Sequence, residues 1–176
     1  ARAPADAVAR RTHEGVDLLE RCLADLESGD SAALEARYAT LLSYALTDIG
    51  EIARAEAVVQ QALNRMKDTE DPYMRVRLYW SMARLAHTEG RASVALTNVR
   101  KAIALLQATE DSVHLARAHL LAAGITLSRD DATTAEQHLD QAEHILGPSA
   151  SVEDSIEIKI RRSRLASLQG RPVEAS

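Results

Sequence analysis

Arginine recurs at one position of a repeating pattern, together with aromatic side chains that could contact a peptide. Arg37, Arg77 and Arg117 stand 40 residues apart. A guanidinium group donates paired hydrogen bonds to a carboxylate, and Trp and Tyr rings offer flat apolar contact. We therefore predict a ligand-binding groove for an acidic or C-terminal peptide or protein segment. Its predicted residues are Arg37, Tyr44, Arg77, Trp80, Arg84, His87 and Arg117.

Two alternatives to this groove remain open from the sequence. The arginines could pair with Glu and Asp of neighbouring helices and stay solvated, as charged side chains on a helix surface commonly do. Trp80, the single tryptophan, could equally pack between repeats. The groove is therefore a hypothesis about which side of the helices faces a ligand.

Histidine spacing does not predict a metal site. His114 and His119 are five residues apart, and His138 and His144 are six apart. Two imidazoles share one helical face when they are four residues apart, and no such pair or HExxH motif occurs. We predict no metal and no cofactor.

Motifs of catalysis are also missing from the sequence. It has no GxSxG elbow, no phosphate-binding loop and no dinucleotide fingerprint, so we predict that the chain is not an enzyme. The single cysteine, Cys22, falls in an apolar column beside Leu19 and Leu23, where we expect a buried thiol. With no disulfide partner and no apolar run near 20 residues, a cytoplasmic location without membrane contact is expected.

A 40-residue period organises the whole chain. The residues that end each first helix are Gly50, Gly90, Asp130 and Gly170, types that favour helix ends and tight turns. Small and apolar columns follow each turn at spacings of four, three and four, which place them on one helical face. The columns are Ala55, Ala95, Ala135; Val59, Val99, Leu139; Ala62, Ala102, Ala142; and Met66, Leu106, Leu146.

This pattern predicts eight helices, near residues 6–27, 32–49, 52–67, 72–89, 92–107, 112–128, 132–146 and 152–169. Residues Ser31, Asp71, Asp111 and Ser151, also 40 apart, are good N-caps for the first helices. We predict one array over residues 1–176: a lone second helix at 6–27, full repeats at 32–67, 72–107 and 112–146, and a partial repeat at 152–176.

These columns resemble those of the tetratricopeptide repeat family. The positions that match best are Tyr79, Met82, Ala83, Ala86, Gly90, Ala95, Val99 and Ala102. The resemblance implies an all-α fold, a right-handed α–α superhelix of antiparallel helix pairs, with the predicted groove on its concave face. The chain departs from the family in its period, which is usually about 34 residues. It also lacks the family's proline after the second helix, where Lys67 and Gln107 stand.

Composition restricts the role of such an array. The net charge of −5 argues against direct nucleic-acid binding, which favours a basic excess. The Ala- and Arg-rich composition suggests a bacterial source. The architecture is similar to the peptide-sensing regions of bacterial helix-turn-helix transcriptional regulators, and such a regulatory region is our leading hypothesis. The alternatives are a structural scaffold or dimerisation domain without a groove ligand, including a homodimer, and an array joined to an enzyme elsewhere.

Overall fold

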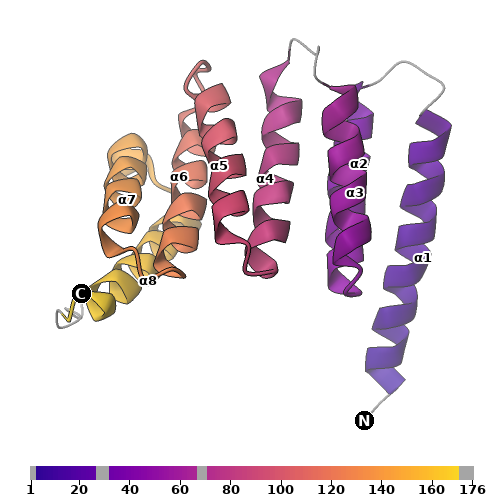
Figure 1. Ribbon diagram of the computed structural model, residues 1–176, viewed down its shortest axis with the longest axis horizontal. Coiled ribbons are helices and arrows are strands. Elements are labelled where there is room, and N and C mark those ends of the chain that lie inside the picture. Colours follow the sequence, from indigo (N-terminus) through magenta and orange to yellow (C-terminus); the bar gives the residue numbers. More distant parts are fainter. Residues whose placement is uncertain (1–2, 27–31, 67–70, 171–176) are drawn as a thin grey trace. The chain divides into compact units, whose positions relative to one another are not determined.

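The computed structural model describes residues 3–26, 32–66 and 71–170, and the side chains of residues 3–11 are not described. Eight α-helices and one 3-10 turn lie in these ranges (Figure 1). They are α1 (Ala3–Leu26), α2 (Ala32–Asp48), α3 (Ile52–Arg65), α4 (Pro72–Thr88), α5 (Ala92–Leu106), α6 (Ser112–Leu127), α7 (Ala132–Leu146), η1 (Gly147–Ser149) and α8 (Val152–Leu168). No helix in the described ranges is long and apolar enough to cross a membrane.

The helices agree closely with those predicted from the period. All eight exist, and the largest difference is at α1, which begins at Ala3 rather than at residue 6. The predicted ends at residues 27 and 67, the proposed cap Ser31 and the segment 171–176 lie outside the described residues. The fold is therefore all-α, built from antiparallel helix pairs, as predicted.

Turn chemistry explains where the first helices end. Gly50, Gly90, Asp130 and Gly170 all have positive φ, between 57° and 82°. Glycine adopts this left-handed conformation without steric cost, and Asp tolerates it better than most residues do. Each of these residues reverses the chain directly after a helix, so the predicted 40-residue spacing of turns is confirmed.

Side-chain caps begin several helices. Asp111 accepts a hydrogen bond from the His114 backbone N–H at 2.9 Å. Ser151 likewise accepts one from the Asp154 N–H at 3.0 Å. Both are predicted caps, and each satisfies a backbone donor that has no partner inside the helix.

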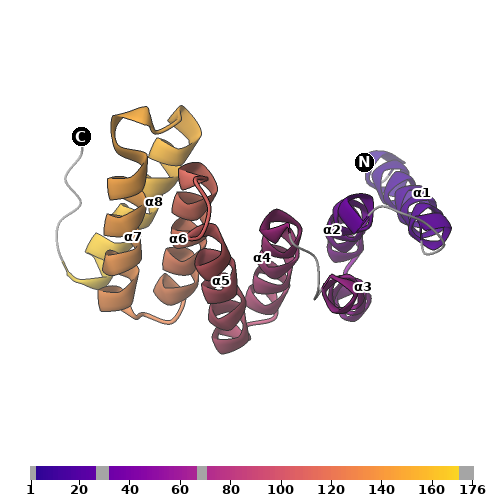
Figure 2. The same ribbon diagram turned by 90° about the horizontal axis from the view of Figure 1, so that it is seen from above.

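The chain divides into two compact units, residues 1–88 and 89–176. In the first unit α1 packs on α2, α2 on α3, and α4 on both α2 and α3 (Figures 1 and 2). In the second unit α5 packs on α6, α6 on α7, and α8 on both α6 and α7. Helices α2, α3 and α4 are thus matched by α6, α7 and α8, 80 residues later. The predicted superhelix depends on how the units are joined and stays a prediction.

Each unit has its own apolar core. In the first, Leu42, Leu46, Val59 and Met66 are at most 1% exposed and pack with Leu78 of α4. In the second, Leu120, Leu127 and Leu139 are equally buried and pack with Ile158 and Leu165 of α8. Small side chains let the helices approach closely. The alanines of the predicted columns, Ala55, Ala62, Ala95, Ala102, Ala135 and Ala142, are all 2% exposed or less.

Candidate functional site

Six of the seven predicted groove residues lie in the first unit, on two helices that pack together. Arg37 and Tyr44 belong to α2, and the other four belong to α4. All three of their arginines, Arg37, Arg77 and Arg84, are exposed, as is Tyr44. The remaining two, Trp80 and His87, are half-buried. The seventh residue, Arg117, belongs to the second unit, and a groove that includes it stays a prediction.

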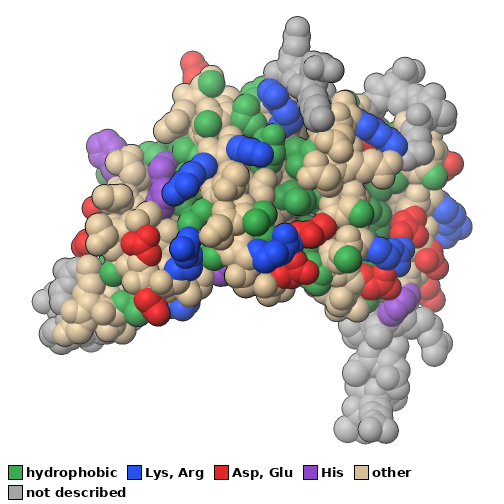
Figure 3. Space-filling view, in the orientation of Figure 1, with side chains coloured by type: hydrophobic (Ala, Val, Ile, Leu, Met, Phe, Trp, Pro, Cys, Tyr) green, Lys and Arg blue, Asp and Glu red, His purple; other side chains and the backbone are tan. Residues whose placement is uncertain are grey.

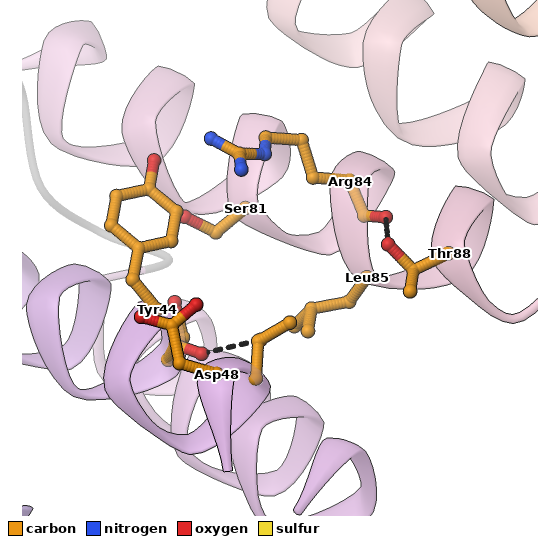
Figure 4. A pocket seen from close by; sticks show the side chains of 8 residues that line it. Tyr44, Asp48, Ser81, Arg84, Leu85 and Thr88 are labelled. Carbon is orange, nitrogen blue, oxygen red and sulfur yellow. Dashed lines mark hydrogen bonds between the residues drawn. The ribbon is translucent and has the colours of Figure 1, made fainter. Parts of the chain in front are cut away.

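A pocket opens between α2 and α4 (Figure 4). The hollow measures about 340 Å³, including the part that is open to solvent. Its lining combines hydroxyl groups, one carboxylate and one guanidinium group. The residues are Ser43, Tyr44, Thr47, Asp48, Ser81, Arg84, Leu85 and Thr88.

Arg84 lies over the ring of Tyr44 at the mouth of this pocket. The guanidinium carbon is 4.8 Å from the ring centroid, a cation–π distance. Stacking leaves the edge of the planar guanidinium group, which carries its N–H donors, open to a ligand. Asp48 lines the same pocket, so donors of Arg84 and acceptors of Asp48 face one hollow.

The four serine and threonine hydroxyl groups of the pocket present acceptors to the hollow. Each donates its hydrogen to a backbone carbonyl of its own helix. The bonds are Ser43 Oγ to Thr40 O at 2.7 Å, Thr47 Oγ1 to Ser43 O at 2.6 Å, Ser81 Oγ to Arg77 O at 3.1 Å, and Thr88 Oγ1 to Arg84 O at 3.0 Å. Because a hydroxyl has one hydrogen and two lone pairs, the oxygen atoms can still accept hydrogen bonds.

The sequence argument missed most of these polar lining residues. Ser43 is 1% exposed, so it also takes part in the packing of the helices. Asp48 and Thr88 had no assigned role. The signal that could have found them is the presence of Ser, Thr and Asp in the C-terminal halves of two helices that pack side by side.

Arg117 in the second unit is engaged by a neighbouring helix. Its Nε donates to Asp154 Oδ1 at 2.8 Å and its Nη2 donates to Oδ2 at 3.2 Å. The Asp154 residue is 3% exposed. These hydrogen bonds from Arg117 hold the pKa of the Asp154 carboxyl below its ordinary value. The open alternative, in which an arginine of this column pairs with a carboxylate nearby, therefore describes Arg117.

In the second unit, the side chain of Arg161 occupies the place that Tyr44 occupies in the first unit. Gly124 of α6 stands 80 residues after Tyr44, and a Cβ added there would lie 3.3 Å from the Arg161 guanidinium group. Arg161 also pairs with Glu157 at 2.6 Å. In the second unit the equivalent side of the helices is thus closed by internal contacts.

Arg37, Arg77 and Arg84 differ from Arg117 in their partners. Within the described part of the chain, none of the three forms an ion pair with a carboxylate. Figure 3 shows Lys and Arg side chains spread over the viewed face rather than gathered into one basic patch. The guanidinium groups of Arg37, Arg77 and Arg84 are therefore available to a ligand.

A histidine pair joins α6 to α7 in the second unit. The Nδ1 atoms of His119 and His138 are 3.0 Å apart, so one ring donates a hydrogen and the other accepts it. Burial, followed by the charge of His138, lowers the pKa of His119 to about 4. Burial and Arg100 of α5 lower the pKa of His138, which Asp131 partly opposes. Two neutral imidazoles are therefore the stable form. No cluster of three potential metal ligands occurs among the described residues.

Acid should weaken this contact before it protonates most carboxylates. In the unfolded chain His119 has a pKa near 6.5, so between pH 6.5 and 4 the unfolded state binds more protons than the folded state. Stability is thus present above pH 6.5 and is lost as pH falls. We expect the free energy of unfolding to drop by about 1–2 kcal/mol from pH 7.5 to 5 on this account.

Urea unfolding at several pH values measures this effect. We expect His119→Leu to flatten the dependence between pH 7.5 and 5, while His144→Leu, at an exposed histidine of α7, leaves it unchanged. An unaltered slope in His119→Leu would show that the pair does not control acid stability.

Comparison with known proteins supports the fold. No protein-family model matches the sequence, and no curated protein matches it. Among solved structures, TPR-like repeats of a protein described as a kinesin light chain from Podosopora anserina match with a TM-score of 0.73 and 17% identity, over 96% of this chain and 87% of that one. A variant of the same repeats gives 0.74, with 17% identity and coverage of 96% and 86%.

A further solved structure, BtubC (BKLC) from P. vanneervenii, matches with a TM-score of 0.69 at 15% identity. The match covers 92% of this chain and 64% of that one. Sequence identities this low carry structural similarity alone, because one fold hosts many functions. The helices, turns and small-residue contacts described above therefore belong to a TPR-like repeat fold.

Proposed function

We propose that this chain is a protein-interaction module that binds a peptide or protein segment with acidic groups between α2 and α4. The observation that carries the proposal is the Arg84–Tyr44 stack at the mouth of a pocket lined with hydrogen-bond acceptors. Arg37 and Arg77, both exposed, extend the positive surface along the same two helices.

The pocket chemistry suits a segment of polypeptide better than an isolated anion. Arg84 would donate to a carboxylate of the ligand, either a side chain or the C-terminus. Asp48 and the hydroxyl oxygens would accept hydrogen bonds from N–H groups, which a peptide carries along its backbone. A free anion would use Arg84 and meet repulsion from Asp48. The proposed ligand thus presents a carboxylate and N–H donors within a few ångströms of each other.

Binding of a labelled library of acidic peptides, measured by fluorescence anisotropy, tests the proposal. We expect Arg84→Ala to weaken the bound sequences about 10- to 100-fold, the loss of a charge-assisted hydrogen bond. Arg164→Ala is the matched control, because Arg164 is exposed and stands 80 residues after Arg84 on the equivalent helix α8. Helical circular dichroism should be unchanged in both variants.

Different outcomes separate the candidate functions. Equal weakening by both substitutions would indicate general charge attraction rather than a site between α2 and α4. Absence of binding across the library would leave the alternative function, a scaffold or dimerisation domain without a groove ligand.

We also propose, more narrowly, that the module is the sensing region of a bacterial transcriptional regulator in the cytoplasm. The support is the likeness in architecture and in Ala- and Arg-rich composition noted above. A gene that encodes a helix-turn-helix domain joined to this segment, with DNA binding that responds to the peptide, is the expected finding. A catalytic domain joined to it would contradict the regulator role while leaving the binding site intact.

A further inference from the structure

Helix α8 carries a row of large apolar side chains that no other described residue covers. Val152, Ile156 and Ile160 of α8 are 76%, 52% and 63% exposed, and their spacing of four residues places them in one stripe. The opposite side of α8 carries Ile158 and Leu165, which pack into the core with α6 and α7. Contiguous exposed aliphatic side chains of this kind mark an interaction surface.

The positions on α6 that stand 40 residues before this stripe are buried. Ala116 and Leu120 of α6 stand 40 residues before Ile156 and Ile160, and they are 0% and 1% exposed. They belong to the same core cluster as Leu139 of α7 and Leu165 of α8. The stripe of α8 therefore has the helix-packing character of its equivalent on α6.

The charges along α8 are complementary to those of a second copy of α8 that runs in the opposite direction. The first half of α8 carries the carboxylates Glu153 and Glu157, and its second half carries Arg164 as an exposed cation. Glu153 and Arg164 are 11 residues apart, about three helical turns, so both border the stripe on the same side. A parallel copy of α8 would bring like charges together, whereas an antiparallel copy would bring opposite charges together.

One antiparallel register satisfies the charges and the apolar stripe at once. A two-fold axis midway between Glu153 and Arg164 places Glu153 opposite Arg164 of the second copy, and the reverse. In this register Ile156 falls within about one residue's rise, roughly 1.5 Å along the helix, of Ile160 of the second copy. Four isoleucine side chains then meet around the axis.

We propose that α8 is a docking surface for a second copy of this chain, in an antiparallel two-fold pair. The isoleucines form its apolar centre and two reciprocal Glu153–Arg164 pairs set its register. Self-complementary surfaces of this kind are the rule in two-fold dimers. Contact through a single helix lies at the small end of interface sizes, so we expect a dissociation constant on the order of 10–100 µM.

Sedimentation equilibrium of the 176-residue chain between about 1 and 500 µM tests the apolar centre. We expect a monomer–dimer equilibrium, and a monomer throughout this range for Ile156→Glu. Val113→Glu is the matched control, because Val113 is 43% exposed on α6 of the same unit and its variant should dimerise as the unsubstituted chain does. A monomer at all concentrations, or a dimer that Ile156→Glu leaves intact, would overturn the proposal.

Charge reversal tests the register. At low salt, where exposed pairs are least screened, we expect Glu153→Arg alone and Arg164→Glu alone to weaken the dimer about tenfold. An equimolar mixture of these two variants should form a heterodimer tighter than either homodimer, since every pair across the axis is then opposite in charge. Local effects within one chain, such as that of Glu153 on Arg117, cannot produce this preference. Homodimers and heterodimers of equal strength would rule out the proposed register.

Discussion

Replacing Asp154 with Ala is expected to lower the free energy of unfolding by about 2–3 kcal/mol. The carboxylate is buried, and it accepts hydrogen bonds from Nε and Nη2 of Arg117 and from the hydroxyl of Ser151 at 2.7 Å. Its removal leaves the guanidinium group without its paired acceptor. The Arg117 side chain is 39% exposed, so water compensates in part and the loss stays below that of a fully buried pair.

Urea unfolding at pH 7 measures this loss, with Asp140→Ala as the control. Asp140 also forms an ion pair between helices, with Arg162 of α8, but the Asp140 side chain is 61% exposed. We therefore expect its removal to change the free energy of unfolding by no more than about 0.5 kcal/mol. Because the folded-state pKa of Asp154 is lowered, its contribution is present above pH 3.8 and is lost as pH falls further. Equal effects of the two substitutions at pH 7 would contradict a stabilising role for burial of the pair.

The helices could be predicted because their signals are local and repeated. The columns led by Ala55 and Val59 recur three times in phase, and a turn-forming residue follows each first helix. Packing that uses the same small residues in each repeat needs no information from distant parts of the chain. The edge of the array is less predictable. Cys22, expected to be buried, is half-buried, since α1 packs mainly on α2 and contacts α3 through the Glu20–Arg54 ion pair.

The candidate site could be predicted only in outline. Two of the predicted residues, Arg84 and Tyr44, are in contact, while the groove as a whole stays a prediction. The column positions could not show that Arg117 is held by Asp154. The equivalent position 80 residues earlier is Met74, so the preceding repeats gave no indication of a carboxylate there. A single substitution on a neighbouring helix thus decides whether an arginine of the column is accessible.

Contacts between helices also explain the missed histidine pair. His119 and His138 are 19 residues apart and belong to different helices, so spacing along one helix gives no indication of it. Their distance depends on how α6 and α7 cross, which the small side chains between the two helices determine. Chemistry that two helices share therefore needs the packing before it can be seen.

Leu139→Ala is expected to produce the largest loss of stability, about 3 kcal/mol in the free energy of unfolding. Leu139 of α7 is fully buried and packs with Leu127 of α6 and Leu165 of α8. Truncation removes three carbon atoms from contact with all three helices, and close packing of helices on both sides limits how far the cavity can collapse. A loss of this size is a large share of the stability of a small domain.

Thermal and urea unfolding measure this loss, with Leu168→Ala as the control in the same unit. Leu168 is 39% exposed, so the same substitution should cost less than about 1 kcal/mol. Because α8 depends on the core beneath it, Leu139→Ala should also increase hydrogen exchange in α8. A destabilised variant with unchanged exchange in α8 would mean that this helix is held mainly by its ion pairs, above all Arg117–Asp154, rather than by the shared apolar core.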